Sequence, residues 1–102
     1  MSLKAAFIFI APNADDVQHR SHIHTDEITL ITVGVDSYAS GIKAAKELVK
    51  QGVKIIELCG GFGHEGVTKI SESIKGEAVV GVVRFDNHPG LDFKSGDEFF
   101  KE

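Results

Sequence analysis

The sequence is short of cysteine and proline, and it has no long apolar run. One cysteine among 102 residues excludes a disulfide framework and a four-cysteine zinc module. The net charge of −4 argues against a general nucleic-acid surface and against an anionic membrane surface. No apolar stretch approaches the length of a membrane span, and no signal peptide opens the chain. These absences leave a cytoplasmic protein as the expectation, with neither nucleic acid nor membrane as a partner.

Short apolar runs rich in β-branched residues are spread along the chain. A chain of 102 residues fits a single α/β domain over residues 1–102 with a core of its own. Runs bounded by Gly or Pro predict strands at residues 5–11, 53–58 and 78–83, buried on both faces. A fourth strand is expected at residues 28–35, where threonines and a glycine interrupt the run.

Amphipathic helices lie between these strands. The first begins after Ser37, whose hydroxyl can cap a free N–H group, and it ends at Gly52. The second is expected from about His64 to Lys75, with Gly76 as its stop. We also favour a short helix around residues 15–23, with a mobile loop leading to an antiparallel strand as the alternative.

The order of elements is typical of a small α/β fold. Strand, helix, strand, helix, strand predicts βαβ units with right-handed crossovers. We therefore expect a small, mostly parallel four-stranded sheet with helices packed on it, and in the favoured version all four strands are parallel.

Two motifs carry a family resemblance: ELCGGFGHEG at residues 57–66 and GVVRFD at residues 81–86. The opening AAFIFIAP at residues 5–12 adds to it. Over roughly residues 4–88, the chain resembles a family of short uncharacterised bacterial α/β proteins, catalogued as a domain of unknown function. The resemblance implies a compact α/β fold and supplies no catalytic residue.

The glycine-rich loop after the strand at residues 53–58 is the strongest candidate for a binding site. Ligands bind outside the carboxyl ends of strands in an open parallel sheet, and this loop joins such an end to a helix. Glycines let a ligand approach the backbone, and the free N–H groups of the helix attract anions. An arginine at the end of the next strand can add a bidentate counter-charge. The predicted ligand-binding residues are Gly60, Gly61, Phe62, Gly63 and Arg84.

Two further expectations belong to this loop. Because neighbouring parallel strands end at the same edge, residues 59–65 and 84–88 should lie together. The alternative to anion binding is a tight strand-to-helix connection in which the glycines serve only the turn.

Four residues are candidates for catalysis: His64, Cys59, Asp86 and His88. A thiol near a helix N-terminus and a histidine has the setting of an activated nucleophile, with Glu57 or Asp86 to orient the histidine. The commoner interpretation of Cys59 is a small buried residue that ends a strand. Imidazoles titrate near neutral pH, so His64 and His88 are suited to moving protons.

A metal site is a third hypothesis. His22 and His24 fall on one side of an extended segment, and His64, Asp86 and His88 could join from neighbouring loops. The spacing matches no specific metal motif, so any metal or cofactor stays unknown.

These candidates support two functions of different classes. The favoured one is a small-molecule metabolic enzyme, a lyase, isomerase or hydrolase, that binds an anionic substrate through the glycine-rich loop and Arg84. The second is a non-catalytic metabolite-binding or regulatory module. An enclosed pocket with perturbed histidine or cysteine pKa values would favour the enzyme, and an open site with a solvated His64 would favour the module.

The last expectation concerns assembly. Right-handed crossovers place the two clear helices on one face of the sheet, yet a parallel sheet needs cover on both. The C-terminal tail, residues 92–102, carries Phe93, Phe99 and Phe100 among acidic residues that should be solvated, Asp97, Glu98 and Glu102. We therefore expect a homodimer or higher homo-oligomer with the tail as an anchor. A tail that folds back on its own sheet is the alternative.

Overall fold

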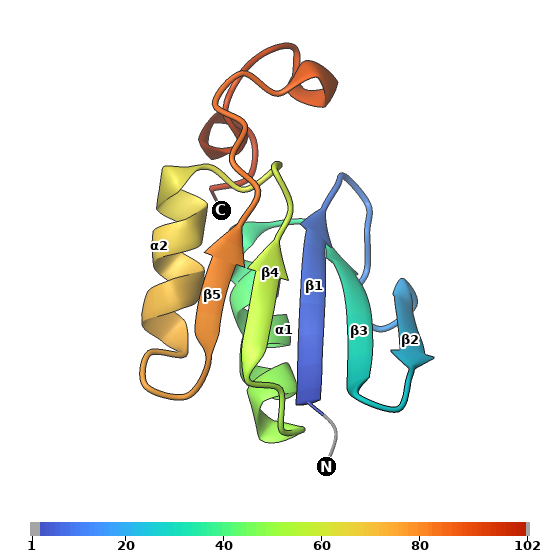
Figure 1. Ribbon diagram of the computed structural model, residues 1–102. Coiled ribbons are helices and arrows are strands. Elements are labelled where there is room, and N and C mark those ends of the chain that lie inside the picture. The colour runs from blue at the N-terminus through green and yellow to red at the C-terminus, as the bar shows by residue number, and fades with distance from the viewer. Residues whose placement is uncertain (1–2, 102) are drawn as a thin grey trace.

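A five-stranded sheet carries the fold in the computed structural model, which describes residues 3–101 (Figure 1). The strands are β1 (Leu3–Ile10), β2 (Arg20–His24), β3 (Ile28–Val35), β4 (Ile55–Leu58) and β5 (Val79–Val82). Their order across the sheet is β2-β3-β1-β4-β5. The pairs β3–β1, β1–β4 and β4–β5 are parallel, and β2 runs antiparallel to β3. The α/β class and the mostly parallel sheet are confirmed.

The four expected strands form and run parallel to one another, but the sheet has a fifth strand that was not expected, the antiparallel edge strand β2. The short helix predicted around residues 15–23 does not form. Residues 15–19 make a single turn in which Asp15 accepts hydrogen bonds from two following amides at 2.7 and 3.0 Å. From Arg20 onward the chain pairs with β3 instead. Only two residues separate Thr25 from Ile28, and the Thr25 amide donates to the Ile28 carbonyl at 2.9 Å. This tight hairpin forces the antiparallel direction.

The two helices are α1 (Tyr38–Lys50) and α2 (His64–Ser73). Ser37 caps α1 as predicted, because its hydroxyl accepts from the Ser40 amide at 3.1 Å. Gly52, with a φ of 98°, turns the chain back toward β4. Helix α2 ends two residues before the expected Lys75. Within residues 3–101, no helix is both long and apolar enough to cross a membrane.

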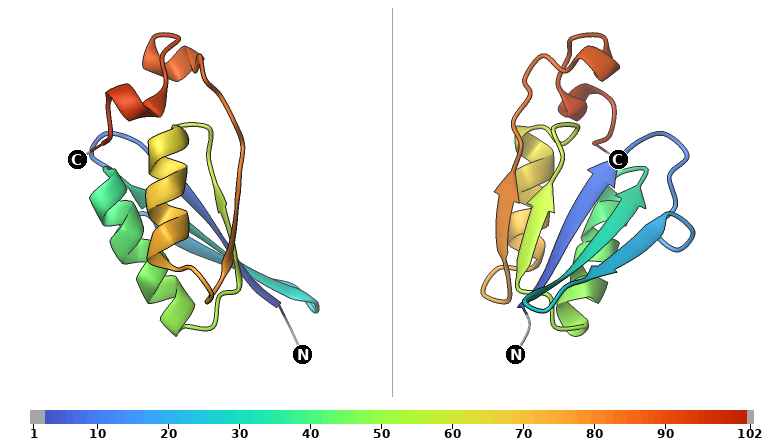
Figure 2. Two further views of the ribbon diagram at one scale, coloured as in Figure 1. Left: turned by 90° about the vertical axis from the view of Figure 1, so that its left-hand side faces the viewer. Right: turned by 45° about the vertical axis from the view of Figure 1, so that its right-hand side comes forward.

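The core lies between one face of the sheet and the two helices, which both pack on that face (Figure 2). Alternate side chains of β1, β3 and β4 point toward the helices and are buried. Helix α1 contributes Leu48 and helix α2 contributes Ile70 to the same cluster. No described helix covers the opposite face of the sheet.

The described part of the tail lies over the carboxyl ends of the strands (Figure 1). Phe100 is only 5% exposed and belongs to the core, whereas Phe93 and Phe99 are exposed. The Phe100 carbonyl accepts from the Tyr38 amide at 3.0 Å, at the first residue of α1. The tail therefore folds back on its own chain, and Glu102 lies outside the described residues.

Candidate functional site

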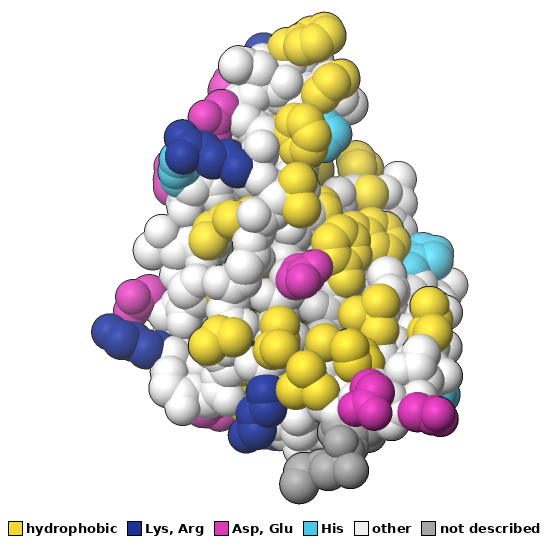
Figure 3. Space-filling model, in the orientation of Figure 1, with side chains coloured by type: hydrophobic (Ala, Val, Ile, Leu, Met, Phe, Trp, Pro, Cys, Tyr) yellow, Lys and Arg dark blue, Asp and Glu magenta, His cyan; other side chains and the backbone are white. Residues whose placement is uncertain are grey.

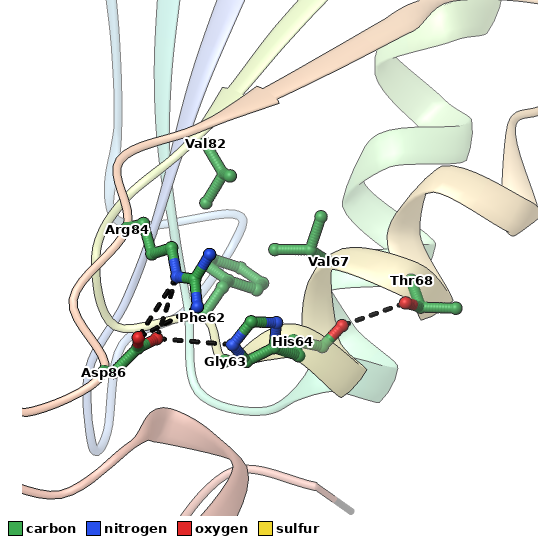
Figure 4. Close-up of a pocket in the computed structure, with 8 residues that line it drawn as sticks. All are labelled: Phe62, Gly63, His64, Val67, Thr68, Val82, Arg84 and Asp86. Atoms are coloured by element: carbon green, nitrogen blue, oxygen red, sulfur yellow. Dashed lines mark hydrogen bonds and ion pairs between the residues drawn. The ribbon is translucent and has the colours of Figure 1, made fainter.

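The loop after β4 and the segment after β5 meet at one edge of the sheet, as predicted from their parallel direction. A pocket of about 250 Å³ lies between them and α2 (Figure 4). Its apolar part is formed by Phe62, Val67 and Val82. The other lining residues are Gly63, His64, Thr68, Arg84 and Asp86.

Three charged or titratable side chains converge at this pocket. Arg84 holds Asp86 in a bidentate pair, with Nε–Oδ1 at 3.1 Å and Nη2–Oδ2 at 3.0 Å. The Nε2 atom of His64 lies 3.3 Å from Oδ1 of the same carboxylate. All three side chains are well exposed, at 66% for Arg84, 51% for Asp86 and 65% for His64. The pocket is therefore open to solvent.

The ion pair sets the electrostatics of the pocket. The hydrogen bonds from Arg84 hold the pKa of Asp86 below its ordinary value, and the same bonds raise the pKa of Arg84. Asp86 is therefore a carboxylate at neutral pH and offsets the positive charge of Arg84. An incoming anion has to compete with Asp86 for the guanidinium.

The N-terminus of α2 is occupied by a carboxylate of the chain itself. Its N-cap, Gly63, has no side chain to accept the first-turn amides. Asp97 of the tail takes that role, accepting from the Glu65 amide at 3.1 Å and from the Gly66 amide at 3.3 Å. Asp97 is thus not the solvated tail residue that the sequence predicted.

Tyr38 connects this carboxylate to the glycine-rich loop. Its fully buried hydroxyl donates to Asp97 Oδ1 at 2.7 Å and accepts from the Gly63 amide at 3.0 Å. Burial raises the pKa of the Tyr38 hydroxyl above its ordinary value, so the group stays a donor. Burial acts to raise the pKa of Asp97, but the bonds from Tyr38 and the two amides outweigh it and leave that pKa lowered.

The glycines of the loop admit neighbouring parts of the chain. A Cβ atom on Gly63 would clash with the Asp97 carboxylate, and one on Gly60 would clash with the ring of Phe85. Gly61 is also buried, and its carbonyl lies against Gly96 of the tail. The close approach that glycine permits is therefore used by the tail and by Phe85. Direct ligand contact with these glycines stays a prediction.

Cys59 and His88 lie apart from the charged cluster. The Cys59 sulfur accepts from the amides of Ile10 at 3.4 Å and Gly61 at 3.3 Å, with no histidine or carboxylate among its bonding partners in residues 3–101. His88 accepts from the Gly90 amide through Nδ1 at 3.0 Å and packs its ring edge-on against Phe85. The structure thus brings together only His64 and Asp86 of the four catalytic candidates.

Of the residues proposed for a metal site, His22 and His24 lie side by side as expected. His22 and His24 do share one side of β2, with ring centroids 6.2 Å apart. Strand β2 is the outer strand on the opposite side of the sheet from β5. Among residues 3–101, no group of three or more His, Cys, Asp or Glu side chains is placed to hold a metal ion.

Sequence reasoning missed Tyr38 and Asp97 as parts of this edge. Tyr38 follows the apolar spacing of α1, which conceals its hydroxyl, and Asp97 stands among exposed charges. The pair Phe99–Phe100 could have indicated the role of the tail. Two large apolar residues at the end of an acidic segment imply that the segment packs against the rest of the protein.

Comparison with known proteins places the chain in a family without indicating an activity. The model of a family described as "Family of unknown function (DUF6506)" matches residues 3–98, so the chain belongs to that family. Neither the curated proteins nor the solved structures gave a match.

Proposed function

We propose that this family member is a non-catalytic binding module for a small metabolite that carries an anionic group. The observation behind the proposal is the convergence of Arg84, Asp86 and His64 beside the apolar part of the pocket. The pocket also lies at the carboxyl edge of parallel strands, where ligands of such sheets bind.

Arg84 supplies the affinity for an anion in this proposal. A guanidinium has five N–H donors in a planar fork, which matches the oxygens of a carboxylate or phosphate. Asp86 occupies Nε and Nη2 of that fork, so it acts as an internal competitor. A favoured ligand carries an anionic group for Arg84 and a hydrogen-bond donor for Asp86, with an apolar part against Phe62 and Val67.

Openness of the site supports binding over catalysis. Proton-transfer sites gain their power from excluded water and from groups tuned toward neutral pKa values. His64 is 65% exposed, and the lowered pKa of Asp86 makes that carboxylate a weak base. Both features favour a solvated recognition site.

The second candidate function is an enzyme, and the distance between Asp86 and His64 favours it. Asp86 lies 3.3 Å from His64 Nε2, close enough to orient the imidazole for proton transfer. In that case the reaction is a lyase, isomerase or hydrolase step on an anionic substrate, with Arg84 as the substrate's counter-charge.

A ligand screen followed by two substitutions tests the proposal. Phosphorylated metabolites and organic acids are screened for a rise in melting temperature, because a ligand that binds only the native state stabilises it by mass action. We expect Arg84→Ala to weaken binding of a hit by about tenfold or more. Lys75→Ala, which removes an exposed positive charge beyond the end of α2, should leave the affinity unchanged. Equal affinity in the Arg84→Ala variant would contradict the proposal.

Asp86→Asn separates the two candidate functions. In a binding module, this change releases Arg84 and removes a competing charge, while the amide oxygen still accepts from the ligand's donor, so an anion should bind several-fold more tightly. In an enzyme, the same change deprives His64 of its orienting carboxylate, so turnover should fall. NMR spectra of the ligand over time show whether it is converted by the native protein.

A further inference from the structure

The sheet has one face that no described segment of the chain covers, and we call it the open face (Figure 3). The residue register places one row of side chains across all five strands of this face. The row is entirely apolar: Ile23, Leu30, Ala5, Ile55 and Val79. At its two ends, Ile23 is 55% and Val79 is 66% exposed.

The next rows extend this apolar surface toward the carboxyl edge. Phe7 and Phe9 of β1 follow on the same face, and Phe9 lies over Gly34 of β3. Glu57 is the one charged residue among the register positions of this face on β1, β3, β4 and β5. It stands on β4, level with Phe7 and with Thr32 of β3.

Physical chemistry requires a cover for this surface. Parallel sheets occur almost only with both faces covered, and the strands of such sheets are apolar on both sides, as the strands of this sheet largely are. The tail lies over the carboxyl ends of the strands rather than over the open face (Figure 2). The described residues 3–101 therefore supply no second layer on this face.

We propose that a second copy of this chain covers the open face, sheet against sheet, with a two-fold axis running parallel to β1. Five strands spaced by about 4.8 Å give a face about 20 Å wide, which is about 25 Å long at the eight-residue strands β1 and β3 and shorter at the others. Side chains that project from the sheet have more accessible surface than this flat area. The area buried per copy therefore comes closer to the roughly 800 Å² per partner of a standard stable interface.

Glu57 selects the direction of the axis. A two-fold axis along β1 exchanges the two sides of the sheet, so β4 of one copy faces β3 of the other. Glu57 then faces the partner's Thr32, whose hydroxyl can donate to the carboxylate. An axis across the strands would set β4 against the partner's β4 and bring the two Glu57 carboxylates toward each other, which is repulsive.

Two further features of the dimer follow from this axis. It brings Val79 of one copy over the partner's Ile23, because these residues end the same row on opposite sides of the sheet. It also keeps both carboxyl edges at one end of the dimer, so the two pockets remain open and point the same way.

Solution mass and a charge exchange test the proposal. Light scattering at micromolar concentration should give twice the 11.0 kDa of the chain. Val79→Glu alone and Ile23→Lys alone should each halve the mass, since each places a charge in an apolar contact. The double variant should regain the dimer mass, because the two new charges then face each other between copies. Within one chain they lie on opposite outer strands, too far apart to pair.

Controls keep the test decisive. Val17→Lys adds the same charge at an exposed valine in the loop before β2, outside the rows of the sheet, and should remain dimeric. Circular dichroism confirms that each variant is folded. A native mass of 11.0 kDa, or single variants that stay dimeric, would overturn the proposal. Single variants that dissociate without rescue in the double variant would overturn the axis along β1.

Discussion

At the scale of single residues, one carboxylate, that of Asp97, holds together the segments that meet at the carboxyl edge of the sheet. Asp97 accepts three hydrogen bonds, from the Tyr38 hydroxyl and from the amides of Glu65 and Gly66. It joins the tail, α1 and the start of α2, whose own N-cap is a glycine. The capping side chain thus comes from 34 positions beyond Gly63, a distance at which no local sequence rule operates.

Asp97→Asn should destabilise the protein and change its response to acid. The substitution leaves one first-turn amide facing an NH₂ group, and we expect a loss of about 1–3 kcal/mol near neutral pH. A carboxyl whose pKa is lowered by folding stabilises the native state above its unfolded pKa of about 3.9 and loses that effect as the pH falls through the folded pKa. The difference from the native protein should therefore shrink below about pH 4.

Urea unfolding between neutral and acidic pH measures this difference. Glu98→Gln is the matched control, because that neighbouring carboxylate is exposed, and its effect should be small at every pH. A stability gap that stays constant down to acidic pH would contradict the role assigned to the Asp97 charge.

Gly63→Ala should also destabilise the protein, for a steric reason. The added methyl group would clash with the Asp97 carboxylate and with Ser95, so the tail has to shift, at a cost of about 1–3 kcal/mol. Gly81→Ala provides the comparison, because a Cβ atom there meets no atom within 4 Å. Thermal melting of the two variants should show a fall for Gly63→Ala and no fall for Gly81→Ala.

At the scale of elements, local signals were sufficient where the chain has periodic apolar residues or a cap of its own. Helix α1 begins after Ser37 as predicted, and the four expected strands all form. Strand β2 was not predicted, because most of its residues are exposed and its conformation depends on pairing with β3. Asp15 accepts hydrogen bonds from the next amides, as a helix N-cap residue does. The helix does not continue, because the chain pairs with β3 from Arg20 onward.

We expect the tail to unfold together with the rest of the domain, because one of its three phenylalanines is buried in the core. Phe100 is buried in the core, so Phe100→Ala should cost about 3–5 kcal/mol through lost burial and the cavity left behind. Phe93→Ala removes a ring that is 66% exposed and should cost far less. Chemical denaturation of both variants decides the matter, and equal effects would show that the tail is not anchored through Phe100.

At the scale of the whole molecule, the crossovers explain both the site and the open face. The connections β3–α1–β4 and β4–α2–β5 progress in one direction across the sheet, so both helices fall on the same side. The same progression places the ends of β4 and β5 together and forms the pocket at Arg84. The sequence predicted that edge from strand direction alone. It could not predict which groups fill it, because those contacts span from the start of α1 to the tail.

A molecule whose second layer is another copy should have a stability that depends on its own concentration. Dissociation accompanies unfolding of such a dimer, so dilution favours the unfolded chain and lowers the melting temperature. We expect calorimetry to show a midpoint that rises by several degrees over a hundredfold increase in protein concentration. The Ile23→Lys variant, which places a charge on the open face, should melt at a lower temperature that does not depend on concentration. A native midpoint that is constant over the same range would mean that the apolar row from Ile23 to Val79 faces water, and the proposed sheet-on-sheet dimer would then be wrong.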